Sequence, residues 1–388
     1  MSEIGKTAVW AITFGGLEIG QKLLKSLSSA SILFVSDTIS RSITNFDDTV
    51  VFDKLSAMFA KQFKNYDAHI CIFSTGIAVR IAAPLVQSKI SDPAVVVVDD
   101  RGFHAISLLS GHLGGANELT LEVARIIGAS PVITTATDIN KLPSIDMVAK
   151  SQNLVIENPD MIKKVNMAFL QGERIRFIDP FNLVKPHIPR QFILNQSTQG
   201  EEFGNDVKLA QESESDQEIR SDQDAQTITV FCDDTAKYEK RVGQDKVSRE
   251  TKKLLLLRPP SLVAGMGCNR GTSKAELMEL LISAFKEHNL SVKSLAAVAT
   301  TALKQDETGL LELADELGKP IKFYSKDELN SVETIENPSD MVEKHIGVKS
   351  VCEAAAILAA QNGHLIVPKI KKGNATIAVA RIIVQHLR

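Results

Sequence analysis

The chain has 388 residues and a formal net charge of -3, from 44 Lys and Arg against 47 Asp and Glu. This near balance disfavours a nucleic-acid-binding protein, which usually carries a basic excess, and gives no reason to expect a membrane partner. No apolar run approaches the ~20 residues needed to span a bilayer, so we expect a cytoplasmic protein of two or three domains.

Short apolar runs alternate with helical patterns over residues 1–140. We expect strands at Thr7–Thr13, His69–Phe73 and Ala94–Val98. The last of these has no polar alternation, which is typical of a strand covered on both faces. Helices are expected after the glycine-containing turns and at Asn117–Ile127. Strands that alternate with helices predict a layered α/β domain with a mainly parallel sheet.

The region from 141 to 258 is less regular. We expect a helix at Asp160–Leu170, with Asn158 as its cap, and a strand at Thr227–Cys232. Between them, residues 196–226 are rich in Gln, Ser, Asp and Glu. Such a composition cannot bury enough apolar surface to offset chain entropy, so we expect a disordered acidic insertion there.

Residues 259–388 return to the alternating pattern. Strands are expected at Ser261–Ala264 and Ile321–Tyr324, and helices at Lys274–His288 and Val351–Ala360. The sequence therefore predicts a multidomain α/β protein of layered domains with mainly parallel sheets, divided at about residues 140 and 258.

The glycine-rich loop Ser110–Asn117 is the strongest local signal for a site. Its glycines allow close backbone approach, and the helix that follows points free N–H groups into the loop. His112 can exchange a proton near neutral pH. The structural alternative is a tight turn in which His112 caps a carbonyl. The predicted substrate contacts in this loop are Gly111, Gly114, Gly115 and Asn117.

A second loop, Gly265–Gly271, lies between a strand and a helix. It does not match the G-x-G-x-x-G fingerprint, which argues against a nicotinamide or flavin cofactor. A turn that binds carboxylate or phosphate, with Arg270 as the fork, fits the residues better. The predicted substrate contacts here are Gly265, Gly267, Arg270, Gly271 and Lys274.

Polar residues also follow several expected strands, at the edge where ligands approach a parallel sheet. Asp99 and Asp100 end a buried strand, and His104 follows closely. A carboxylate there can orient a histidine or activate water. The alternative is a turn with a solvated aspartate pair. Further predicted substrate contacts are Thr75, Gly76, Arg80, Arg101, Thr134 and Thr135.

Metal-ligand patterns are missing from the sequence. The four cysteines form no C-x-x-C pair and the eight histidines form no H-E-x-x-H. We therefore expect no metal site and reduced cytosolic thiols.

Taken together, the motifs resemble one family. The segments GIAVRIAAPL, VVVVDDRGFHAISLLSGHLGGANELT and TTATD resemble the N-terminal part of the cobalamin biosynthesis protein CbiG. The segments LVAGMGCNRGTS, SVCEAAAIL and HLIVPK resemble the C-terminal domain of that family, which is shared with CobE proteins. The two halves match in the expected order, and the region from 141 to 258 matches least.

The resemblance implies a cobalt-precorrin 5A hydrolase of anaerobic cobalamin (vitamin B12) biosynthesis. Such an enzyme opens a δ-lactone and releases acetaldehyde by breaking a carbon–carbon bond, to give cobalt-precorrin 5B. Cobalt then arrives with the substrate, so no protein cofactor is expected. From residue chemistry, the catalytic candidates are His104, His112, Asp99 and Asp100, with backbone N–H groups of Gly114 and Gly115 as oxyanion donors.

Two other functions are open at this point. A non-catalytic tetrapyrrole carrier would bind without turnover, and a nucleotide-binding enzyme would be stabilised by a nucleotide. The expected partners are the cobalt-corrinoid substrate, transiently other enzymes of the pathway, and a second copy in a homodimer. A macrocycle of this size would suit a groove between domains, with the two glycine loops facing one another.

Overall fold

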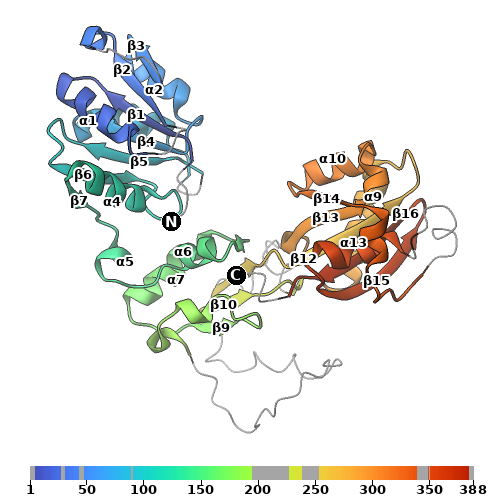
Figure 1. Cartoon of the computed structure of the whole chain (residues 1–388). Helices are drawn as coiled ribbons and strands as arrows, with labels where there is room; N and C mark the ends of the chain where they lie inside the picture. The colour runs from blue at the N-terminus through green and yellow to red at the C-terminus, as the bar shows by residue number, and fades with distance from the viewer. Residues whose placement is uncertain are drawn as a thin grey trace. The chain divides into compact units, whose positions relative to one another are not determined.

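The computed structural model describes residues 5–27, 31–42, 48–88, 91–194, 227–237, 253–338, 348 and 350–383. It divides into two compact units, Met1–Met147 and Val148–Arg388 (Figure 1). The multidomain α/β class is confirmed. The expected acidic insertion at 196–226 lies outside the described residues, and the predicted three-part division stays a prediction.

The first unit contains a seven-stranded sheet in the order β3-β2-β1-β4-β5-β6-β7 (Figure 1). Its first five strands run parallel to one another, β6 runs antiparallel to β5, and β7 runs parallel to β6. The loops after β5 and β6 therefore leave from opposite edges of the sheet. The strands are β1 (Thr7–Ala11), β2 (Ser31–Ser36), β3 (Thr49–Phe52), β4 (Ala68–Ile72), β5 (Ala94–Val98), β6 (His104–Leu109) and β7 (Ser130–Val132).

Helices cover both faces of this sheet. On one face, Leu17 of α1 (Phe14–Leu24) and Leu119 of α4 (Ala116–Ile127) belong to a core with the alternate residues of the strands. On the other, Phe59 of α2 (Leu55–Gln62) and Ala78 of α3 (Thr75–Ala82) pack around Trp10. Burial on both faces explains why the central strands lack polar alternation.

Two short helices, α5 (Ala136–Ile139) and α6 (Ile145–Ser151), follow β7. They bring the chain back across the end of the loop that precedes α4, because side chains of both helices contact His112. Neither helix was expected from the sequence, since each is too short to show a full apolar period.

The second unit begins with a small four-stranded sheet, β8-β11-β10-β9. The expected helix α7 (Asp160–Leu170) is confirmed. The expected cap is wrong, because the Asn158 side chain donates to the Leu254 carbonyl at 2.7 Å and accepts from the Leu256 N–H at 2.9 Å. These two backbone groups belong to strand β11, so the Asn158 side chain bonds to the strand and does not cap the helix. The strands are β8 (Val155–Ile156), β9 (Arg176–Ile178), β10 (Thr229–Cys232) and β11 (Leu254–Arg258).

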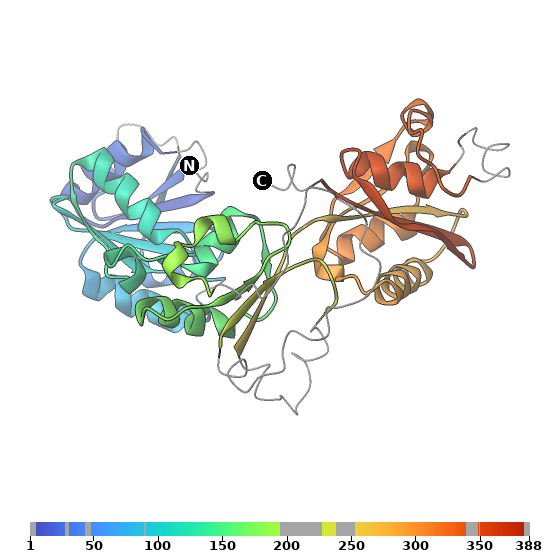
Figure 2. The same cartoon turned by 90° about the horizontal axis from the view of Figure 1, so that it is seen from below.

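A five-stranded sheet, β14-β13-β12-β16-β15, forms the rest of this unit, and Figure 2 shows helices on both of its sides. Strands β12 to β14 are parallel, whereas β15 and β16 form an antiparallel pair beside β12. The elements are β12 (Leu262–Cys268), α9 (Lys274–Glu287), β13 (Leu295–Thr301), α10 (Thr308–Glu316), β14 (Ile321–Tyr324), α11 (Lys326–Asn330), α13 (Val351–Ala359), β15 (His364–Lys372) and β16 (Ala375–Arg381).

Candidate active site

The catalytic candidates fall at opposite edges of the seven-stranded sheet. His104 begins β6 beside the end of β5, where Ala105 pairs with Val98. His112 comes after the other end of β6. Six residues of strand separate the two edges by about 20 Å. The structure therefore does not bring Asp99 or Asp100 to His112, because β6 reverses the chain direction.

Asp99 serves the turn between β5 and β6. Its carboxylate accepts backbone N–H groups of Arg101, Phe103 and His104 at 3.0, 3.2 and 2.6 Å. Burial raises the pKa of this carboxyl, but the three N–H donors and the nearby His104 outweigh burial and hold the pKa below its ordinary value. The His104 Nδ1 atom lies 3.4 Å away, and that side chain is 57% exposed. Asp99 therefore belongs to a turn, as the alternative interpretation expected, but its carboxylate is hydrogen-bonded to the backbone of that turn and is not a solvated one.

Asp100 and the α3 residues complete this edge. The Thr13 hydroxyl donates to Asp100 and accepts the Gly16 N–H, so Asp100 is tied to the N-terminus of α1. Helix α3 begins with Thr75 and Gly76. Arg80 lies one turn further along this helix, and its Nη1 atom would be 3.8 Å from a Cβ atom added at Gly76. Arg101 lies over the Phe103 ring. Among the described residues of this edge, the one imidazole–carboxylate pair is His104 with Asp99, and both side chains are partly exposed.

The opposite edge holds a cluster built around His112. Its Nε2 atom lies 2.9 Å from Asp138 Oδ2 of α5, and its Nδ1 atom lies 3.4 Å from Asp146 Oδ2 of α6. Ser144 Oγ donates to Asp146 Oδ1 at 2.6 Å. We call His112, Asn117, Asp138, Ser144 and Asp146 the His112 cluster. The exposed fractions differ: 17% for the His112 side chain, 46% for Asp138 and 7% for Asp146.

Asn117 fixes the outer carboxylate. Its amide donates to Asp138 Oδ2 at 2.9 Å and to Thr135 Oγ1 at 3.1 Å, and it accepts the Ser107 hydroxyl at 2.6 Å. A Cβ at Gly111 would lie 2.8 Å from Asn117 Oδ1, so this close approach requires glycine. The G-H-x-G-G-A-N spacing therefore places the histidine and the asparagine on the same carboxylate.

The two carboxylates raise the pKa of His112. The hydrogen bond to Asp146 is the largest cause, burial opposes it, and Asp138 adds to the increase. Asp146 raises the pKa of His112 more than Asp138 does, although it lies farther from the ring. The reason is that the Asp146 carboxylate is shielded from water, which weakens charge interactions. The imidazolium form is thus favoured at the centre of the cluster.

The backbone of the glycine loop corrects one prediction. The Gly115 N–H donates to the His112 carbonyl at 2.9 Å, so it is not an oxyanion donor. Gly115 has a φ of 85°, which suits its place before α4. A Cβ at Gly114 would collide with Ser110, which gives that glycine a packing role. Thr135 joins the cluster through Asn117, whereas Thr134 is exposed beside it.

The second glycine loop is engaged with its own unit. A Cβ at Gly265 would collide with the Cys352 carbonyl of α13, so this glycine permits close packing of a helix on the sheet. A Cβ at Gly267 would lie 2.7 Å from Thr376 Oγ1. The Gly271 N–H donates to Glu307 Oε1 at 2.8 Å.

The two cations of this loop have acidic partners. Arg270 pairs with Asp306 and donates to the Leu303 carbonyl, and Lys274 pairs with Glu316 at 2.6 Å. Both cations are partly exposed. A substrate carboxylate would have to replace these partners. The predicted groove between the two glycine loops stays a prediction.

Sequence reasoning missed most partners of His112. Asp138 lies in the quoted polar segment that follows β7, but only the threonines before it were taken as contacts. Ser144 and Asp146 lie in the less regular region after residue 140, where no motif marked them. Their role depends on how the chain returns to the loop, which a linear pattern does not contain.

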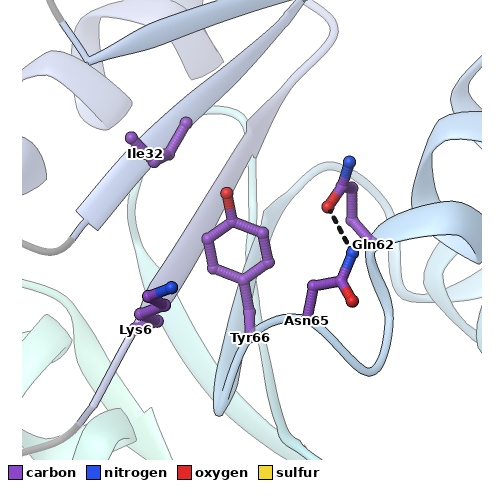
Figure 3. A pocket seen from close by; sticks show the side chains of 5 residues that line it. All are labelled: Lys6, Ile32, Gln62, Asn65 and Tyr66. Carbon is purple, nitrogen blue, oxygen red and sulfur yellow. Dashed lines mark hydrogen bonds between the residues drawn. The ribbon is translucent and has the colours of Figure 1, made fainter.

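A depression of about 610 Å³ lies elsewhere in the first unit, at the start of β1 and β2 (Figure 3). It is lined by Lys6, Ile32, Gln62, Asn65 and Tyr66, and Gln62 accepts from Asn65 at 3.0 Å. Its lining includes no residue of the His112 cluster. Among the described residues, no group of three or more His, Cys, Asp or Glu is arranged to hold a metal ion, and no helix could cross a bilayer.

The fold and the His112 cluster define a multidomain α/β protein with a histidine held between two carboxylates at one sheet edge. The chain matches family models described as Cobalamin synthesis G N-terminal (57–138), Cobalamin biosynthesis central region (143–253) and Cobalamin synthesis G C-terminus (262–380). A cobalt-precorrin-5A hydrolase of Priestia megaterium is 35% identical over 98% of this chain and 96% of its own length. One from Salmonella typhimurium is 33% identical over 96% of each chain.

The C-terminal part has a further relative. Protein CobE of Sinorhizobium sp is 32% identical over 31% of this chain and 79% of its own length. The chain therefore belongs to the CbiG family of cobalamin biosynthesis proteins, and the predicted family is confirmed.

Proposed function

We propose that this protein is a cobalt-precorrin 5A hydrolase of cobalamin biosynthesis and that its chemistry takes place at the His112 cluster. The names of the relatives that match nearly the whole chain support this activity. The observation that carries the site is the His112 ring between two carboxylates. The reaction opens a δ-lactone and then releases a two-carbon fragment as acetaldehyde. We place this reaction in the cytoplasm. The protein needs no cofactor of its own, because cobalt belongs to the substrate.

Lactone opening needs a base for the attacking water and an acid for the leaving oxygen. Asp138 Oδ2 is held by His112 and Asn117, whereas Oδ1 accepts no hydrogen bond from the described residues. We assign water activation to Oδ1. Water adds to the lactone carbonyl carbon and gives a proton to Asp138. The ring C–O bond then breaks, and the alkoxide takes a proton from His112.

Fragmentation then uses the same histidine in reverse. The alkoxide has become the hydroxyl of the two-carbon fragment, and neutral His112 takes the hydroxyl proton back. The C=O bond of acetaldehyde forms as the carbon–carbon bond to the macrocycle breaks. The electron pair of that bond passes into the conjugated ring of the substrate. His112 ends protonated, and Asp138 returns its proton to solvent, so the cluster is ready for another cycle.

The substrate carries acetate and propionate arms, which suit exposed cations. We propose that Arg270 and Lys274 of the second unit bind such arms by exchanging their present acidic partners for them. His104 and Asp99 have no catalytic part in this proposal, since they lie at the opposite sheet edge from His112.

The test is an anaerobic incubation of the purified protein with cobalt-precorrin 5A, following acetaldehyde and product mass. His112→Asn and Asp138→Asn should each lower kcat about 10²–10⁴-fold, the usual contribution of a general acid or base. His104→Asn is the matched control and should retain turnover. Tight binding without acetaldehyde from the unaltered protein would favour a tetrapyrrole carrier. Full turnover by His112→Asn would overturn the site.

A further inference from the structure

We propose that Asp146 is the positioning residue of the site: its buried carboxylate holds the His112 ring through Nδ1, which leaves Nε2 to exchange the proton. This inference rests on the proposed function and adds a residue that no glycine motif contains. Asp146 lies in the first turn of α6, beyond the N-terminal family match, which ends at residue 138. The segment after that match is therefore needed to complete the site.

The carboxylate of Asp146 is held in one orientation. The Ser144 hydroxyl donates to Oδ1 at 2.6 Å, and Oδ2 lies 3.4 Å from His112 Nδ1. Ser144 Oγ also lies 3.3 Å from Nδ1, so the hydroxyl and the carboxylate face the same ring nitrogen. Both residues are buried. A substrate has no access to this side of the ring.

The other side of the ring is less covered, because its carboxylate partner is partly exposed. Nε2 faces Asp138, whose side chain is 46% exposed, and Thr137 Oγ1 lies 3.1 Å from the same nitrogen. The bond that one imidazole nitrogen makes fixes the protonation of the other. A buried acceptor at Nδ1 therefore keeps a proton there in both states of the ring. The proton at Nε2 is then the one that moves.

The charges that face the ring come from two elements. Asp138 approaches from α5 and Asp146 from α6, and each is the acidic member of an ion pair with His112. Asn117 of α4, Thr137 and Ser144 are neutral contacts of the ring or of its carboxylate partners. Removal of the Asp146 charge should therefore lower the pKa of His112 most, because this residue is the largest cause of its increase.

The experiment is an NMR titration of the His112 ring in the full chain. Asp146→Asn should lower the pKa of His112 by about one unit or more, the usual effect of a neighbouring opposite charge. Ser144→Ala should lower it less. Asp92→Asn is the matched control, because Asp92 is also a buried carboxylate of this unit and accepts the Gln87 and Ser88 N–H groups at 2.8 Å. It should leave the titration unchanged.

Kinetics give a second readout. The high-pH limb of kcat/KM should move to lower pH in Asp146→Asn, with kcat reduced and KM kept, and Asp146→Glu should restore part of kcat. An unchanged titration in both Asp146→Asn and Ser144→Ala would overturn the positioning role, whatever the activity. If the unaltered protein releases no acetaldehyde, the proposed function fails, and the titration still decides the role of Asp146.

Discussion

Because the buried His69 stays neutral while the unfolded chain takes up a proton, the first unit is expected to lose stability as the pH falls below neutrality. His69 of β4 is fully buried; its Nδ1 accepts the Trp10 Nε1–H at 3.1 Å, and its Nε2 lies 3.0 Å from the Phe63 carbonyl. An indole N–H only donates and a carbonyl only accepts, so both bonds fit the neutral ring. Burial lowers the pKa of His69 to about 4, and the Phe63 bond opposes this only in part.

The size of the effect follows from the difference in pKa between the two states. The pKa is 6.5 in the unfolded chain and about 4 in the folded one, so both states are neutral above pH 6.5 and the full stability is present there. Below pH 6.5 the unfolded chain takes up the proton first, and stability falls by about 1.4 kcal/mol per pH unit. We expect a loss of about 2 kcal/mol between pH 7 and 5, and about 3.4 kcal/mol once the pH is well below the folded pKa.

The assay is urea unfolding followed by tryptophan fluorescence. Trp10 is the only tryptophan and stacks on Phe34, with ring centroids 4.2 Å apart, so it reports on the first unit alone. His69→Gln should be less stable at pH 7 and should lose the fall in stability that His69 causes between pH 7 and 5. His104→Gln, which removes an exposed histidine, should keep it. His112, whose pKa is raised in the folded state, acts with the opposite sign in every variant, so the unaltered protein is compared with His69→Gln. An unfolding free energy with the same dependence on pH from 7 to 5 in these two proteins would refute the reasoning.

Three further predictions concern the second unit. Gly265→Ala should destabilise it by about 1–3 kcal/mol, measured by urea unfolding, because the new methyl group meets the Cys352 carbonyl; an unchanged midpoint would show that α13 can move away. Asp234→Ala should lower the thermal midpoint, at a loss of about 3–5 kcal/mol, because Asp234 is fully buried and accepts from Arg381 at 2.7 and 3.0 Å. Arg270→Gln should raise KM for cobalt-precorrin 5A with kcat kept, and an unaltered KM would remove Arg270 from the substrate site.

The elements that the sequence predicted best are those with an unbroken local pattern. Ala94–Val98, Ile321–Tyr324 and Asp160–Leu170 have the expected bounds, because an apolar run or a full helical period is written in consecutive residues. Strand β3 was missed, since its apolar run has only three residues, 50–52, and two of the four strand residues are exposed. The Asn158 cap was wrong because a neighbouring strand offered its side chain a better set of partners than the helix did.

The candidate site also has a part that the sequence predicts and a part that it does not. The sequence by itself determined the family, the α/β class and the loop that carries His112 and Asn117, since these depend on residues that are consecutive in the chain. Only the tertiary structure decided which carboxylates serve His112. The antiparallel strand β6 takes His112 to the opposite edge of the sheet from Asp99, and the short helices after β7 bring Asp138 and Asp146 to the ring. Hydrogen bonds and ion pairs act over a few ångströms, so the partners of a side chain are set by how the chain returns to it.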